Sequence, residues 1–199
     1  LTESVQIEEV HVHSNAFGFW PQTFEQITEY LNVNNNRLLP VMKINHFLMN
    51  GETGIYHDDV SGIIAAIEKS ELHGRDILFS MDEPMWKVRI ECLLRNKTAA
   101  CDEVNNRYAQ TLVTLNRAVQ TLRQRFPGSG IIHLEAWIEL ALQKKASPGD
   151  NVILLNDAEY VGFICYGAIH HCGSELESYR HQIEYGEWVW EAMMKLEVN

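Results

Sequence analysis

Apolar residues recur along the chain in two patterns: short unbroken runs, and longer stretches in which they are spaced every three or four positions. An unbroken run is typical of a buried strand, and helical spacing is typical of an amphipathic helix. The runs predict strands over residues 5–12, 38–48, 76–81, 131–134, 152–155 and 158–166. The spaced stretches predict helices over residues 21–31, 58–71, 86–94, 102–126, 137–145 and 179–197.

The predicted strands alternate with the predicted helices, and breaks rich in proline, glycine and serine fall at residues 127–130 and 147–150. This alternation indicates βα units and therefore an α/β fold with a mainly parallel sheet. Five or six strands can form an open doubly wound sheet, whereas a complete (β/α)₈ barrel takes about 250 residues. We expect TIM-barrel-like geometry, an incomplete barrel of five to six strands. Residues 1–199 then form a single domain, a fragment of a larger barrel.

Composition narrows the class of partner. The net charge of -11 disfavours nucleic acid, whose phosphates need a basic face, and it disfavours an anionic membrane surface for the same reason. No segment approaches the run of about 20 apolar residues that spans a membrane, so we expect no membrane span. A hydrophobic content of 46% with 22% charged residues is ordinary for a globular domain.

The four cysteines form two close pairs, Cys92 with Cys101 and Cys165 with Cys172. Each pair brackets a polar turn region, which favours local disulfides over zinc ligands, because zinc sites favour a two-residue cysteine spacing. Such disulfides imply an oxidising compartment, and hence a secreted or periplasmic protein. Free thiols in a cytosolic protein are the alternative.

The clearest chemical signal is the segment 76–86, in which an apolar run leads into Asp82, Glu83, Pro84, Met85 and Trp86. Proline cannot continue the ladder, so the strand should stop there with both acids at its carboxyl end. Ligands bind at that end of parallel sheets and barrels. Two acids and an aromatic at this position indicate acid/base chemistry on a polar, ring-shaped substrate. The alternative is that the acids cap the next helix.

Other predicted strand ends also carry polar side chains. Strand alternation places His11 with His13, Lys43 with Asn45, and His133 with Glu135 on shared faces, and it places Glu83 in phase with the apolar positions before it. Aromatic side chains suited to stacking on sugar rings lie close to these ends: Phe17, Phe19, Trp20, Trp86, Trp137 and Tyr166. The sequence therefore predicts a polar cleft at one edge of the sheet.

Three motifs in this order resemble the (β/α)₈-barrel glycoside hydrolase superfamily: Asp-Glu-Pro at 82–84, His-Leu-Glu-Ala-Trp at 133–137, and Glu-Tyr-Val-Gly-Phe-Ile-Cys-Tyr-Gly at 159–167. The resemblance covers residues 38–173. In that superfamily an Asn-Glu-Pro or Asp-Glu-Pro triplet ends the fourth strand and its Glu is the general acid/base, a role that falls here on Glu83. A later strand with a Tyr-Val-Gly-Phe pattern lines the sugar site, which matches residues 160–166.

The chain departs from this pattern in two places. Ile164 stands where a polar side chain could face the site, and no strand that would carry the superfamily's nucleophile, usually its seventh, is evident. Glu135 is the internal substitute, as nucleophile or base, because neighbouring strands lie about 4.8 Å apart and glycosidases need two carboxyl groups about 5–9.5 Å apart. Asp82 would be a supporting acid.

In this interpretation the remaining polar groups hold sugar hydroxyls: Lys43, Asn45, His133 and Tyr166. No cofactor is needed. The substrate is a poly- or oligosaccharide.

Two alternatives remain open. The pair His11 and His13 at a strand end resembles the first metal motif of amidohydrolase-type metal hydrolases, since two imidazoles on one strand face can share a metal. The other alternative is a barrel that binds a carbohydrate or a protein without cleaving it.

Overall fold

The computed structural model describes residues 16–33, 38–51, 53–70, 76–91, 104–146 and 153–164 of the 199-residue chain. Within these residues a five-stranded sheet runs in the order β1-β2-β3-β4-β5, and every neighbouring pair is parallel. The strands are β1 (Ala16–Phe19), β2 (Leu39–Lys43), β3 (Leu78–Asp82), β4 (Gly130–Ala136) and β5 (Tyr160–Ile164).

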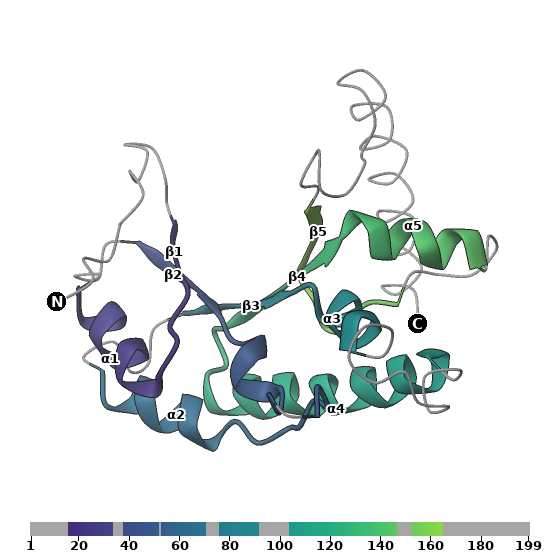
Figure 1. Cartoon of the computed structure of the whole chain (residues 1–199). Helices are drawn as coiled ribbons and strands as arrows, with labels where there is room; N and C mark the ends of the chain where they lie inside the picture. Colours follow the sequence, from purple (N-terminus) through teal and green to yellow (C-terminus); the bar gives the residue numbers. More distant parts are fainter. Residues whose placement is uncertain are drawn as a thin grey trace, which may run out of the picture.

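Helices connect the strands. They are α1 (Phe24–Val33), the 3₁₀ turn η1 (Asn45–Leu48), α2 (Ser61–Glu68), α3 (Pro84–Ile90), α4 (Val104–Arg125) and α5 (Trp137–Ala146). Figure 1 shows α1, α2 and α4 along one side of the sheet. The sheet is curved, and its concave face is turned away from these helices. The strand order never reverses, unlike that of a doubly wound sheet. The α/β class and the parallel sheet are confirmed, and the arrangement is compatible with an incomplete TIM-barrel-like fold.

One face of the sheet is an apolar layer against the helices. Register pairs Met42 with Phe79, and Met81 with His133, and all four side chains are fully buried. The Phe79 ring lies 6.4 Å from that of Phe126, at the end of α4, measured between centroids. This face is the core of the molecule.

The other face carries the alternate positions. Lys43 pairs with Ser80, and Asp82 follows Ser80 two residues later, so all three belong to the face opposite the helical core. Lys43 and Asp82 retain partial exposure, at 25% and 14% of their side chains. The polar groups predicted from the strand ends therefore divide between two faces.

The structure differs from the prediction at three strands. The strand expected over 152–155 is wrong, because residues 153–155 are described and form no strand. The strand predicted over 38–48 ends at Lys43 and is followed by η1. The apolar Leu48 reaches the core from this helical turn. The short strand β1 was not predicted, because four residues carry too little pattern. The expected strand 5–12 and helix 179–197 lie outside the described residues.

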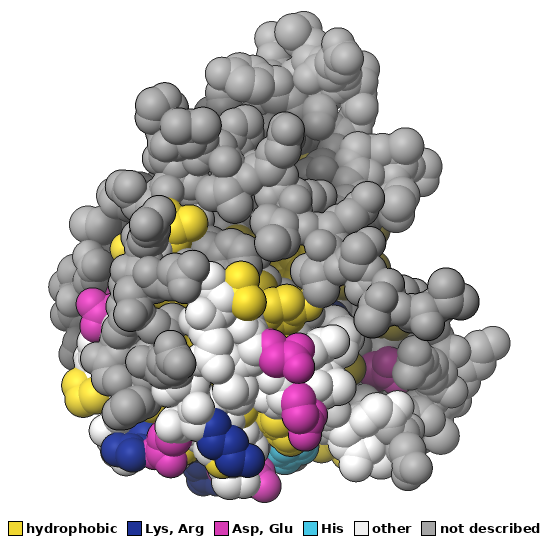
Figure 2. Space-filling view, turned by 90° about the vertical axis from the view of Figure 1, so that its left-hand side faces the viewer, with side chains coloured by type: hydrophobic (Ala, Val, Ile, Leu, Met, Phe, Trp, Pro, Cys, Tyr) yellow, Lys and Arg dark blue, Asp and Glu magenta, His cyan; other side chains and the backbone are white. Residues whose placement is uncertain are grey.

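No helix in the described ranges combines the length and apolar character that a bilayer crossing requires. Figure 2, which views one side of the molecule, shows Lys and Arg side chains next to acidic ones along its lower edge. The charges displayed there are mixed in sign.

Candidate functional site

The turn after β3 has an unusual backbone. Glu83 adopts φ 53° and ψ 47°, and it is the one non-glycine residue of the described part with a positive φ. Its N–H donates to the carbonyl of Leu134 at 2.6 Å, and Pro84 then begins α3 at the position where helices favour proline. A left-handed conformation costs a non-glycine residue about 1–2 kcal/mol. Retained strain of this kind gathers at functional sites.

The side chain of Glu83 is also unusual. Its Oε1 atom is buried and has no hydrogen-bond partner. Burial raises the pKa of its carboxyl above the ordinary value, and the charges of Asp82 and Glu135 raise it further, against the opposing effect of Lys87 and Lys43. An acid whose pKa is raised and whose oxygen has no partner is suited to donate a proton.

Asp82 is the ionised neighbour of Glu83. Its Oδ2 atom lies 2.5 Å from Nζ of Lys43 and 3.2 Å from Nζ of Lys87, and Lys87 also donates to its backbone carbonyl. Burial opposes ionisation of Asp82, but the hydrogen bond from Lys43 and the two lysine charges outweigh it and lower the pKa of the carboxyl. The adjacent acids therefore have pKa values shifted in opposite directions, which is how one site keeps a proton donor beside an anion.

Asn45 fixes the backbone of this turn. Its side chain is fully buried, its Nδ2 donates to the Asp82 carbonyl at 2.9 Å, and its Oδ1 accepts from the Asp82 N–H at 3.4 Å. The side chain thus continues the pairing of β2 with β3 beyond the last residue of β2. Its amide is committed to the protein, although Asn45 was predicted to hold a sugar hydroxyl.

Glu135 lies on the helical side. Its carboxylate is fully buried and accepts N–H groups from Met85 at 3.0 Å, Trp86 at 3.1 Å and Ala136 at 3.0 Å. Met85 and Trp86 belong to the first turn of α3, whose N–H groups have no partner within the helix. The side chain therefore caps α3 from the neighbouring strand. The cap expected from Asp82 or Glu83 is supplied by Glu135, and Glu83 makes no side-chain cap bond.

His133 supports Glu135. Its Nδ1 accepts the N–H of Leu155 at 3.1 Å, so its Nε2 carries the proton and donates to Oε2 of Glu135 at 3.3 Å. Both ring nitrogens are engaged and the side chain is fully buried. His133 and Glu135 share a strand face as expected, but that face packs on helices.

The other predicted site residues have varied placements. Trp137 is 6% exposed and Trp86 is half-buried. The remaining predicted residues lie outside the described residues: His11, His13, Cys92, Cys101, Cys165, Tyr166 and Cys172. The carboxyl edge of the sheet thus brings together Lys43, Asn45, Asp82 and Glu83, while His133 and Glu135 point to the helices.

Two further side chains lie at this edge, and one of them, Lys87, was not predicted as a site residue. Trp20 follows β1 and is 71% exposed, with Nζ of Lys43 5.5 Å from its ring centroid. Lys87 reaches back to β3 from one turn into α3. Trp20 was expected among the aromatic side chains suited to stacking on sugar rings. For Lys87 no sequence signal was available, because its position depends on where the helix begins.

His46 also contributes a free polar atom. The ring makes a hydrogen bond to the backbone of Pro21, and its Nε2 atom is buried without a partner. A proline backbone offers only a carbonyl, so Nδ1 donates to it and Nε2 is left with a lone pair. Burial lowers the pKa of the imidazole, and the charges of Lys43 and Lys87 lower it further. The ring is therefore neutral at neutral pH.

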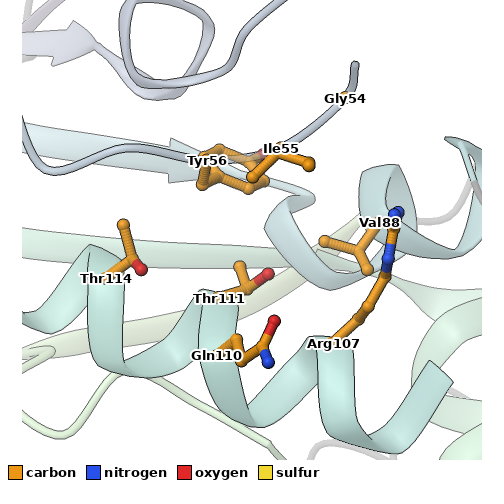
Figure 3. A pocket seen from close by; sticks show the side chains of 8 residues that line it. All are labelled: Gly54, Ile55, Tyr56, Val88, Arg107, Gln110, Thr111 and Thr114. Atoms are coloured by element: carbon orange, nitrogen blue, oxygen red, sulfur yellow. The ribbon is translucent and has the colours of Figure 1, made fainter. Parts of the chain in front are cut away.

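A separate cavity of about 160 Å³ lies between the loop that follows η1 and helix α4. Figure 3 shows Tyr56 and its loop neighbours facing the helix, with Arg107, Thr111 and Thr114 on the opposite wall. The lining supplies hydroxyl, amide and guanidinium groups but no carboxylate or imidazole. It therefore lacks the acid/base pair found at the carboxyl edge.

Comparisons with known proteins do not identify the site. The chain matches no protein-family model and no curated protein. Within the described ranges, no three His, Cys, Asp or Glu side chains come together in a group that could hold a metal ion.

Proposed function

We propose that the carboxyl edge of the sheet cleaves a glycosidic bond in a poly- or oligosaccharide, with Glu83 as the general acid. Glu83 would give its proton to the glycosidic oxygen as the bond to the leaving sugar breaks. The observation that carries the proposal is the unpartnered buried oxygen of Glu83, on a strained backbone, in a carboxyl whose pKa burial raises.

Asp82 would keep Glu83 protonated. Its anionic carboxylate disfavours a second charge beside it, so the proton of Glu83 is retained at a higher pH. Glycoside hydrolysis needs a second carboxyl group as nucleophile or base. The carboxylate of Glu135 is engaged by three N–H groups and an imidazole, so we assign it to positioning α3. The second carboxyl is then Asp82 or belongs to the part of the chain outside the described ranges.

Side chains around the two acids supply contacts for a sugar. Trp20 offers an exposed ring face for stacking, and Lys43 lies between that ring and Asp82. The free Nε2 of His46 can accept a hydrogen bond from a hydroxyl. These groups replace Asn45 and His133 in our assignment, because both of those side chains are committed to the protein.

The test measures reducing ends released from a panel of polysaccharides by the wild type, Glu83→Gln and Glu29→Gln. Glu29 is an exposed glutamate of α1 and serves as the matched control. We expect Glu83→Gln to lower the rate by about 10²–10⁴-fold, the usual contribution of a general acid, and Glu29→Gln to leave the rate unchanged. Equal rates for the wild type and Glu83→Gln on a cleaved substrate would refute the assignment.

One observation favours a second candidate function. Glu135, the carboxylate expected to complete a catalytic pair, is a helix cap, so the chain is also suited to bind a carbohydrate without cleaving it. Saturable binding of a glycan by the wild type with no release of reducing ends, across the same panel, would support this candidate.

A further inference from the structure

Two lysine side chains meet at the carboxyl edge of a chain whose net charge is -11. The ammonium groups of Lys43 and Lys87 both face one carboxylate oxygen, Oδ2 of Asp82. The nearby carboxylate of Glu135 is engaged by N–H groups at the start of α3, and it faces the helical side. Two ammonium groups at this edge thus share one carboxylate oxygen.

The lysines have donors to spare. An ammonium group has three N–H donors. Lys87 uses donors on the carbonyl and on Oδ2 of Asp82, whereas the contacts of Lys43 are Oδ2 of Asp82 and the face of Trp20. Lys43 is 25% exposed, so its ammonium can reach a bound molecule. A buried or half-buried cation with free donors next to an exposed aromatic ring favours an anionic ring-shaped ligand.

We propose that the substrate is an acidic sugar, a hexuronate, whose carboxylate binds Lys43 beside Lys87 while its ring stacks on Trp20. This inference rests on the proposed function, since it names the substrate class of the same site. The exocyclic carboxylate of a hexuronate projects from the edge of the ring. A ring lying on Trp20 can therefore turn this group toward Nζ of Lys43, 5.5 Å from the tryptophan centroid.

The arrangement also separates the sugar carboxylate from Glu83. A substrate anion next to Glu83 would compete with Asp82 for the lysines, whereas one bound at the Trp20 side of Lys43 leaves the pair of Asp82 with Lys87 intact. The substrate carboxylate then accepts from the donors of Lys43 that Asp82 does not use. A neutral sugar offers no such charged acceptor, so the site would distinguish acidic from neutral sugars.

The test measures binding by titration calorimetry with Glu83→Gln, so that turnover does not interfere. The probes are trigalacturonate and trimannuronate, each compared with its full methyl ester, which differs only in charge. We expect the acid form of one probe to bind at least about tenfold more tightly than its ester, as a charge-assisted hydrogen bond provides. Raising the salt concentration should reduce the difference.

Variants show which residues produce the preference for the acid over its ester. In the Glu83→Gln background, Lys43→Met should remove the preference for the acid, and Lys43→Arg should retain it, which separates loss of charge from loss of fold. Trp20→Ala should weaken acid and ester alike. Lys69→Met changes an exposed lysine at the end of α2 and should have no effect.

Equal affinity for acid and ester in both sugars, or a preference that persists in Lys43→Met, overturns the inference. Its failure is distinguishable from that of the proposed function. Cleavage of neutral glycans that depends on Glu83, without acid preference, leaves the general acid in place and removes the hexuronate assignment. A preference for the acid that depends on Lys43, without cleavage of any glycan, retains the hexuronate assignment and removes the general acid.

Discussion

Oε2 of Glu135 lies 3.0 Å from the backbone nitrogen of Met85, so a side chain of β4 caps the helix that follows β3. The carboxylate is placed at the positive end of the helix dipole and satisfies N–H groups that would otherwise be unpaired. Glu83 and Pro84 immediately precede this first turn. The cap therefore holds the segment that carries the candidate acid.

Removing the cap should destabilise the protein. In Glu135→Ala the buried N–H groups of Met85 and Trp86 lose their acceptor and His133 loses its partner. We expect the free energy of unfolding to fall by about 3 kcal/mol, from unpaired buried donors and a lost cap. Urea denaturation measures this. Glu29→Ala is the control and should change the value by less than about 0.5 kcal/mol. A similarly small effect of Glu135→Ala would contradict the capping role.

The end of β3 could be predicted from the sequence because Pro84 is a local signal. Proline removes a ladder donor whatever surrounds it, and the strand ends at Asp82 as expected. Alternation also placed His133 and Glu135 on one face. It could not say which face, because a period of two fixes relative phase and leaves the choice of side to tertiary packing.

The expected phase of Glu83 with Phe79 and Met81 does not extend past the strand. Glu83 turns left-handed, so alternation no longer describes its direction. The contact of Lys87 with Asp82 joins residues five apart across a strand–helix turn, and no period of strand or helix produces it. Its prediction would require knowledge of the turn geometry.

Glu83 should lower the free energy of unfolding of the protein. Replacing it by glycine removes the steric cost of a positive φ and a buried oxygen that lacks a partner. We expect Glu83→Gly to be more stable than the wild type by about 1 kcal/mol. Thermal or urea unfolding measures the difference.

Gly54→Ala, which adds a side chain at a positive φ, is the matched comparison for Glu83→Gly. Gly54 has φ +64°, and a Cβ added there would lie 2.4 Å from Cγ of Glu91. Gly54→Ala should therefore destabilise the protein. A loss of stability in Glu83→Gly as large as that in Gly54→Ala would show that the Glu83 side chain contributes to the fold.

The stability of the wild type relative to Glu83→Gln should depend on pH. Because the pKa of Glu83 is raised in the folded state, the folded protein binds its proton more tightly than the unfolded chain does. The stabilising effect of the proton is therefore present below the ordinary pKa of 4.5 and is lost as pH rises through the folded value. We expect Glu83→Gln to gain stability relative to the wild type as pH rises from about 4.5 through the folded value, and to keep that gain at higher pH.

This comparison is made by urea denaturation at a series of pH values, with Glu29→Gln as the reference. The pKa of Asp82 is shifted downward, so its contribution is lost only as pH falls below its ordinary value of 3.8, on the other side of this range. A constant difference between the wild type and Glu83→Gln from acidic to neutral pH would contradict a raised pKa of Glu83.

The most direct measurement is a carbon-13 NMR titration of the Glu83 carboxyl, assigned by its absence in Glu83→Gln, because it requires no knowledge of the substrate. We expect a midpoint above the ordinary value of 4.5 in the wild type, and a lower midpoint in Asp82→Asn, where the anion that favours the proton is removed. A midpoint at or below 4.5 in the wild type, or one that does not change in Asp82→Asn, would contradict the role of Glu83 as a protonated acid beside an ionised one.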